Sequence, residues 1–181
     1  MSEKEKRQGY TLWLTGLSNA GKTTLGIILK SYLESKGIKV EHIDGNVVRE
    51  NLCRDLGFSP QDRIKNIERV CLLTQILNRN GIWVIASLIT PYNTMRHFCR
   101  QNLENYVEIY VKCSLDVAIK RDRKGLYSKA LAGEIENFTG ISDLFEEPDC
   151  PDIVVVTEQK TPEECLQTIV NWLERKIILS G

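Results

Sequence analysis

Histidine is scarce in this 181-residue chain, and the two that occur, His42 and His97, are far apart in the sequence. This scarcity argues against a histidine-based metal site and against a nucleophile paired with a neighbouring histidine base. The six cysteines form no C-x-x-C pair, which argues against a zinc site. We therefore expect most thiols to be reduced packing residues of an intracellular protein.

Long apolar runs and net charge are also missing. No stretch approaches the roughly 18 apolar residues that a membrane helix needs, and residues 1–8 are too charged for a signal peptide. Lysine and arginine together number 24 and are balanced by 24 acidic residues, so no bulk charge attracts nucleic acid or an anionic membrane. We expect a soluble cytoplasmic protein with neither of these partners, whose positive charge is gathered locally.

A glycine-rich segment at residues 14–24 (LTGLSNAGKTT) fits G-x-x-x-x-G-K-[ST] at every fixed position. It follows an apolar run and opens a helical pattern near Lys22, which is the strand–loop–helix context of a phosphate-binding loop. Its glycines let backbone N–H groups turn toward a polyphosphate, and the helix N-terminus adds a positive dipole end. Lys22 would pair with the ATP phosphates, and Thr23 would ligate Mg²⁺. The predicted ATP-binding residues are Gly16, Leu17, Ser18, Asn19, Ala20, Gly21, Lys22, Thr23 and Thr24.

Apolar runs alternate with helical patterns along the rest of the chain. This alternation indicates one α/β domain, a doubly wound parallel sheet with flanking helices, over residues 1–181, with a flexible extension at 1–9. Residues 122–151 are charged and punctuated by glycine, which is typical of a lid over a phosphate site. Strands are predicted at residues 10–14, 40–43, 82–89, 106–111 and 153–156, and helices begin near residues 22, 60, 93, 115 and 162.

Ligands of such sheets bind at the carboxyl ends of the strands. The strand at 82–89 ends without the acid that many P-loop ATPases and GTPases carry near the end of a later strand. Asp44, at the end of the strand at 40–43, could instead orient Mg²⁺-bound water or accept the proton of an attacking hydroxyl. This arrangement favours a small-molecule kinase. Because Asp-Gly is also a turn signal, the alternative for Asp44 is to cap the next helix.

Several blocks of sequence follow one another along the chain. In chain order they are the phosphate loop, DG with Arg49, DLGFS at 55–59, DR with Asn66, TPY at 90–92, KGLY at 124–127 and FTGI at 138–141. These blocks cover about residues 11–175 and resemble the adenylylsulfate kinase family. The resemblance implies a P-loop kinase that uses ATP and Mg²⁺ to phosphorylate the 3′-hydroxyl of adenylyl sulfate during sulfate activation. It also implies a homodimer and is compatible with a sulfate-activating partner enzyme.

The resemblance also assigns roles to single residues. It makes Asp44 and Lys22 the catalytic pair, with Asp44 near Mg²⁺ through water, and adds Arg121 to the ATP site. Arginine suits an anionic substrate because its guanidinium offers two donors at once. On the residues alone, the arginines could equally be solvated helix charges and the phenylalanines core. The substrate-binding residues implied are Arg49, Phe58, Arg63, Asn66, Thr90, Lys124 and Phe138, with an adenine between the two phenylalanines.

Three positions near the expected acceptor, Asn46, Val47 and Asn93, depart from the usual family pattern. Asn46 removes a carboxylate beside the metal, and Asn93 removes a cation. These departures keep open a related kinase that acts on the 3′-hydroxyl of another nucleotide, such as a cytidine diphosphoramidate. A non-catalytic nucleotide-binding regulatory module is the second alternative, although the retained Lys22, Thr23 and Asp44 favour catalysis.

Overall fold

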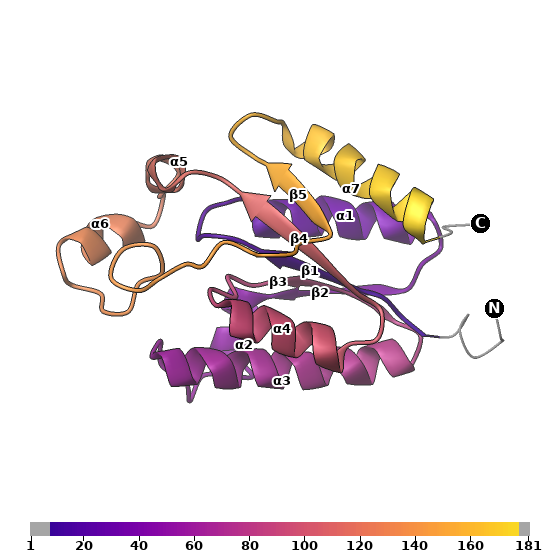
Figure 1. Ribbon diagram of the computed structural model, residues 1–181, viewed down its shortest axis with the longest axis horizontal. Coiled ribbons are helices and arrows are strands. Elements are labelled where there is room, and N and C mark those ends of the chain that lie inside the picture. The colour runs from indigo at the N-terminus through magenta and orange to yellow at the C-terminus, as the bar shows by residue number, and fades with distance from the viewer. Residues whose placement is uncertain (1–7, 178–181) are drawn as a thin grey trace.

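Five parallel strands form the centre of the computed structural model, which describes residues 8–177 (Figure 1). Most of the predicted flexible extension lies outside the described residues, although Gly9 donates its N–H to the carbonyl of Asn78 at 2.8 Å. The strand order is β2-β3-β1-β4-β5, and every neighbouring pair is parallel. The strands are β1 (Thr11–Thr15), β2 (Val40–Asp44), β3 (Trp83–Ser87), β4 (Tyr106–Lys112) and β5 (Ile153–Val156).

Helices cover both faces of this sheet, which confirms the doubly wound fold. Helices α1 and α7 lie on one face and α3 and α4 on the other, while α5 and α6 lie beyond the edge where the strand arrows end (Figure 1). Within the described residues, no helix combines the length and the apolar character needed to cross a membrane. The helices are α1 (Lys22–Ser35), α2 (Gly45–Glu50), α3 (Pro60–Arg79), α4 (Asn93–Asn102), α5 (Leu115–Lys120), α6 (Leu126–Leu131) and α7 (Pro162–Lys176).

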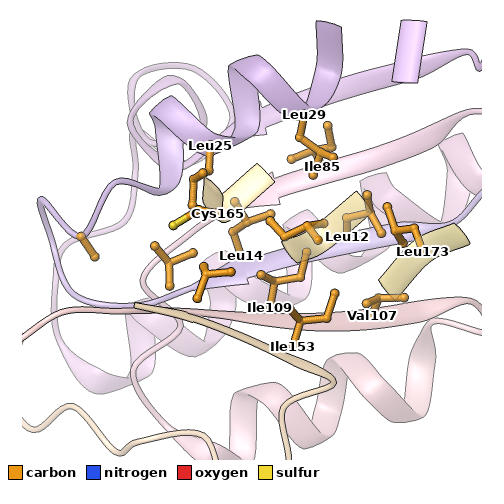
Figure 2. Close-up of a cluster of buried hydrophobic side chains, with 14 of the residues drawn as sticks. Leu12, Leu14, Leu25, Leu29, Ile85, Val107, Ile109, Ile153, Cys165 and Leu173 are labelled. Carbon is orange, nitrogen blue, oxygen red and sulfur yellow. The ribbon is translucent and has the colours of Figure 1, made fainter. Parts of the chain in front are cut away.

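The strand β1 is buried along its whole length, because both of its faces carry apolar side chains. Leu12 and Leu14 point into the larger cluster beneath α1 and α7, which Figure 2 shows. Trp13, on the opposite face, belongs to a second cluster with residues of α3 and α4. Burying each such side chain contributes about 1.5–3 kcal/mol to stability, so β1 holds the start of the following loop in a fixed place. Five of the six thiols are buried and all are free, as expected for packing residues.

Local capping signals place several helix starts where the sequence predicts them. The Ser59 hydroxyl accepts the N–H of Asp62 at 3.2 Å at the start of α3, and Thr161 and Glu164 form a capping box on α7. No helix was assigned by apolar spacing at α2 or α6, each of which has six residues, although Asp-Gly offered a possible cap for α2. The strand predicted at 82–89 is shorter than expected and ends at Ser87.

Candidate active site

A cleft of about 920 Å³ opens at the carboxyl ends of the strands. Its walls come from the phosphate loop, the end of β2, the start of α3, the loop after β3 and the segments before α6 and α7. Cations outnumber carboxylates eight to two on these walls, although the whole chain has no net charge. This local excess suits a polyanionic ligand. The cations are Lys22, Arg49, Arg63, Lys120, Arg121, Arg123, Lys124 and Lys160, and the carboxylates are Asp44 and Asp122.

The phosphate loop has the strand–loop–helix context that the sequence predicts, since it joins β1 directly to α1. Gly16 has φ 149°, and a Cβ there would lie 2.3 Å from the carbonyl oxygen of Val111. Gly21 has φ 104° and caps α1, so both glycines are required by the backbone. Three predicted ATP-binding residues, Gly16, Leu17 and Ala20, belong to the loop but do not line the cleft. Those that do line it are Ser18, Asn19, Gly21, Lys22, Thr23 and Thr24.

Lys22 is the buried cation of this loop, with only 8% of its surface exposed. Its Nζ donates to the carbonyls of Gly16 at 2.9 Å and Leu17 at 2.6 Å. Burial lowers the pKa of the Lys22 ammonium to about 8, although the nearby Cys113 and Asp44 partly oppose the shift. A polyphosphate in the cleft would favour the charged form of the Lys22 ammonium, so we expect the protonation of Lys22 to depend on the ligand.

The Asp44 carboxylate both caps the following helix and contacts the phosphate loop. Its Oδ1 accepts the N–H of Asn46 at 2.9 Å and thereby caps α2, while its Oδ2 accepts the hydroxyl of Thr23 at 2.5 Å. The two alternatives are compatible because a carboxylate has two oxygens. A carboxylate beside a hydroxyl is also a donor set that suits Mg²⁺, which retains several waters and takes its other ligands from phosphates.

The two predicted substrate arginines lie over the ring of Phe58. The guanidinium carbons of Arg49 and Arg63 are 4.7 Å and 5.6 Å from the ring centre, and the ring itself is 55% exposed. Arg63 is 7% exposed and donates to the carbonyls of Phe58 and Asn137 at 3.1 Å and 2.6 Å. Phe58 is therefore not core, and Arg63 is not a solvated helix charge.

Two uncharged residues of the predicted acceptor site also line the cleft. Asn66 lines the cleft but is buried, and its Oδ1 accepts no hydrogen bond from residues 8–177. Thr90 has φ 47° and accepts the indole N–H of Trp13 at 2.8 Å, while its carbonyl accepts from Arg96. The Thr90 hydroxyl therefore has a structural partner in the second core cluster.

Phe138 lies apart from the cleft walls. Its ring packs edge-on against Tyr127, with the ring centres 4.9 Å apart, and it borders the larger core cluster. Tyr127 in turn donates its hydroxyl to the carbonyl of Ser18 at 3.1 Å. The structure therefore does not bring Phe58 and Phe138 to facing walls, and stacking of Phe138 on an adenine stays a prediction.

Comparisons with known proteins decide the family. A family model described as adenylylsulphate kinase matches residues 8–156. The chain belongs to this family. A probable adenylyl-sulfate kinase of Pseudomonas aeruginosa is 50% identical over 162 residues, which is 90% of this chain and 76% of that protein. An adenylyl-sulfate kinase of Halothermothrix orenii is 44% identical over 170 residues, covering 94% of this chain and 92% of the relative.

A solved structure supports the same conclusion for the fold of this kinase. The APS kinase of Mycobacterium tuberculosis, solved in complex with AMPPNP and APS, superposes with a TM-score of 0.88. The two sequences are 34% identical, and the match covers 92% of this chain and 98% of that structure.

Two further predicted residues, Arg121 at the end of α5 and Lys124 before α6, line the cleft. Arg121 donates to the hydroxyl of Thr157 at 3.0 Å and to its carbonyl at 2.7 Å. Thr157 was not predicted, although its position just after β5 follows the strand-end rule that singled out Asp44. Lys160, three residues further on, also lines the cleft without having been predicted.

Asp143 is a third residue that sequence reasoning missed. Its carboxylate accepts the hydroxyl of Tyr92 at 2.8 Å and 2.7 Å and lies 3.4 Å from Nε of Arg63. The side chain of Asp143 is only 13% exposed, so the Arg63 contact is a partly buried ion pair. It joins the segment at 122–151 to the start of α3. No local pattern in the sequence marks this contact, because it joins residues eighty positions apart.

Proposed function

We propose that this kinase transfers the γ-phosphoryl group of ATP to the 3′-hydroxyl of adenylyl sulfate and releases 3′-phosphoadenylyl sulfate. The observation that carries the proposal is one cleft that contains both a phosphate loop and a wall of two arginines over an exposed phenylalanine. Membership of the adenylylsulphate kinase family supports it, and so does the solved relative, which holds two nucleotides.

The donor half of the site would hold ATP by its phosphates. Backbone N–H groups of the loop and the N-terminus of α1 would face the phosphate oxygens, with Lys22 among them. Arg121 and Lys160 lie on the wall that leads to α7 and would contact the rest of the nucleotide. Thr23 and Asp44 would hold Mg²⁺, which neutralises charge on the phosphate oxygens when bound.

The acceptor half would orient the attacking hydroxyl. Arg49 and Arg63 would hold the anionic part of adenylyl sulfate, and Phe58 would stack on its base. Asp44 would accept the proton of the 3′-hydroxyl as the phosphoryl group moves in line. Such transfer depends mostly on positioning and charge, so no covalent nucleophile is required. Lys124 and the lid would exclude water, which would otherwise hydrolyse ATP.

An acceptor comparison tests this function. ADP release is measured with ATP and adenylyl sulfate, with ATP and a cytidine diphosphate derivative, and with ATP alone. Fast release that requires adenylyl sulfate is expected. Preference for the cytidine compound would identify the related nucleotide kinase, and no acceptor-dependent release at all would identify a regulatory module. Varying adenylyl sulfate over a wide range also reveals any inhibition by the acceptor.

Proton uptake at Lys22 provides a prediction about the donor half. In the free protein the Lys22 pKa is about 8 and lies below its usual value, so Lys22 is mostly neutral at pH 8.5. ATP phosphates favour the charged form, so binding at pH 8.5 should take up protons, whereas binding at pH 6.5 should not. Calorimetry in two buffers of different ionisation enthalpy measures this uptake. Lys22→Arg, which stays charged, should remove this proton uptake. Equal binding heats in the two buffers at pH 8.5 for the wild type would contradict the prediction.

The two phenylalanines give a matched pair of variants for the acceptor half. Phe58→Ala should weaken acceptor binding about ten- to a hundredfold, since stacking is worth about 1–3 kcal/mol per base, with little change in melting temperature. Phe138→Ala should also weaken acceptor binding if its ring reaches the base, and should lower the melting temperature because it packs on Tyr127. Calorimetric acceptor affinities and melting curves measure both. Unchanged affinity in Phe138→Ala would assign that ring to lid packing alone.

The assembly of the kinase is a further proposal. The family resemblance supports a cytoplasmic homodimer that receives adenylyl sulfate from a sulfate-activating enzyme. Light scattering at working concentration would give twice the mass of the chain for a homodimer, and the mass of one chain would contradict it.

A further inference from the structure

Gly26 lies in the middle of α1, where glycine costs about 1 kcal/mol relative to alanine. A Cβ at this position would lie 2.3 Å from Nε2 of His42, 2.6 Å from its Cε1 and 2.9 Å from the hydroxyl of Ser87. His42 projects from β2 on the same side as Asp44, two residues later. The missing side chain at Gly26 is therefore what lets the imidazole fit between α1 and the sheet.

Hydrogen bonds connect this imidazole to the phosphate loop. Nε2 of His42 lies 2.8 Å from the hydroxyl oxygen of Ser87, and that hydroxyl donates to the carbonyl of Lys22 at 3.3 Å. A hydroxyl has one proton, so a Ser87 that donates to Lys22 accepts from His42, and the imidazole proton is then on Nε2. The chain of bonds joins β2 and β3 to the first turn of α1.

The same face of α1 also presents Thr23, one turn before Gly26. Thr23 donates to Asp44 at 2.5 Å on the neighbouring strand end, so the imidazole contact lies beside the Thr23–Asp44 pair. We propose that His42 is a positioning residue: in its Nε2–H form it holds, through Ser87, the first turn of α1 against the end of β2, so that Thr23 meets Asp44. This inference rests on the proposed role of Asp44 in phosphoryl transfer.

The surroundings of His42 disfavour a charged imidazole. Burial lowers the pKa of the His42 imidazole, Asp44 on the same strand opposes this shift, and Lys30 on α1 adds to it. Lys22, also on α1, presents its carbonyl to Ser87.

Nuclear magnetic resonance of the unmodified protein tests the tautomer without any substrate. Only two histidines occur in the chain, so the imidazole nitrogen spectrum contains two spin systems, and His97→Gln assigns them. The Nε2–H form is expected for His42. An Nδ1–H form at neutral pH would overturn the proposal.

Kinetics with matched variants test the positioning role. His42→Leu removes the donor and should lower kcat about three- to tenfold, the worth of one hydrogen bond. His42→Gln keeps an N–H donor and should restore kcat to within about twofold. Gly26→Ala should displace the imidazole and reproduce His42→Leu, whereas His97→Gln on exposed α4 should match the wild type.

Wild-type kcat in His42→Leu would overturn the positioning role. The proposed function fails in a different way, because a wrong acceptor appears as slow turnover of the wild type itself. The kinetic comparison would then be repeated with the acceptor that the enzyme prefers. The tautomer measurement is independent of either outcome.

Discussion

Lys22→Ala is expected to lower kcat/KM about a thousandfold while leaving the fold intact. The ammonium is the loop cation that can follow charge toward the β–γ bridging oxygen, and no water can replace it in a site where it is 8% exposed. Its depressed pKa shows that the folded protein disfavours this charge, so removing it relieves a desolvation cost. Losing the bonds to Gly16 and Leu17 costs about 1 kcal/mol each, which roughly offsets that relief.

Steady-state ADP release measures kcat/KM, and a melting curve shows whether the fold is intact. Lys65→Ala is a suitable control, since Lys65 is exposed on α3 and lies outside the cleft walls. A Lys22→Ala protein that melts normally and retains more than about a tenth of the wild-type kcat/KM would show that the loop N–H groups alone carry the γ-phosphoryl charge.

Local signals made the donor half predictable from the sequence. The phosphate loop needs particular residues at fixed spacing, because Gly16 and Gly21 must adopt positive φ and Lys22 must open a helix. Ser59 and Thr161 likewise marked helix starts, since a cap acts within three residues of itself. These features depend on neighbours in the sequence, so a single chain reveals them.

Contacts between distant elements were not predictable in the same way. Asp143 reaches Arg63 across eighty residues, and Phe138 turns to Tyr127 instead of the cleft, in each case because of how the lid packs. His42 fits against Gly26 because of the distance between α1 and β2, and no periodic pattern in the sequence indicates that distance. The strand order with β1 at the centre was also left open by the pattern of alternating elements.

Asp44 shows why a local signal and a functional role need not compete. Asp-Gly after a strand correctly indicated a helix cap, and the strand-end rule correctly placed the same carboxylate in the cleft. One oxygen caps α2 and the other accepts from Thr23, so the cap fixes the direction in which the second oxygen points. In the proposed mechanism the capping bond therefore helps to preorganise the site.

Asp44→Asn should therefore lower kcat about a hundred- to a thousandfold and change ATP affinity less than about tenfold. Asparagine keeps an oxygen to cap α2 and places an amide beside Thr23, so the fold and the loop are retained. It cannot accept the proton of the 3′-hydroxyl, and its neutral oxygen is a weaker partner for a divalent cation. Rapid-quench turnover and calorimetric ATP binding measure the two quantities separately.

Asp122→Asn is the matched control for this variant, because Asp122 is the other carboxylate on the cleft walls. Its Oδ2 accepts the N–H of Tyr127 at 2.7 Å at the start of α6, away from Thr23. Both variants remove one negative charge from the cleft, but only Asp44→Asn removes it beside the phosphate loop. Equal losses of kcat would indicate a general effect of cleft charge, and normal kcat in Asp44→Asn would leave Asp44 as a helix cap alone. A large loss confined to Asp44→Asn would assign a catalytic role to that carboxylate, through the proton of the 3′-hydroxyl or through the cation.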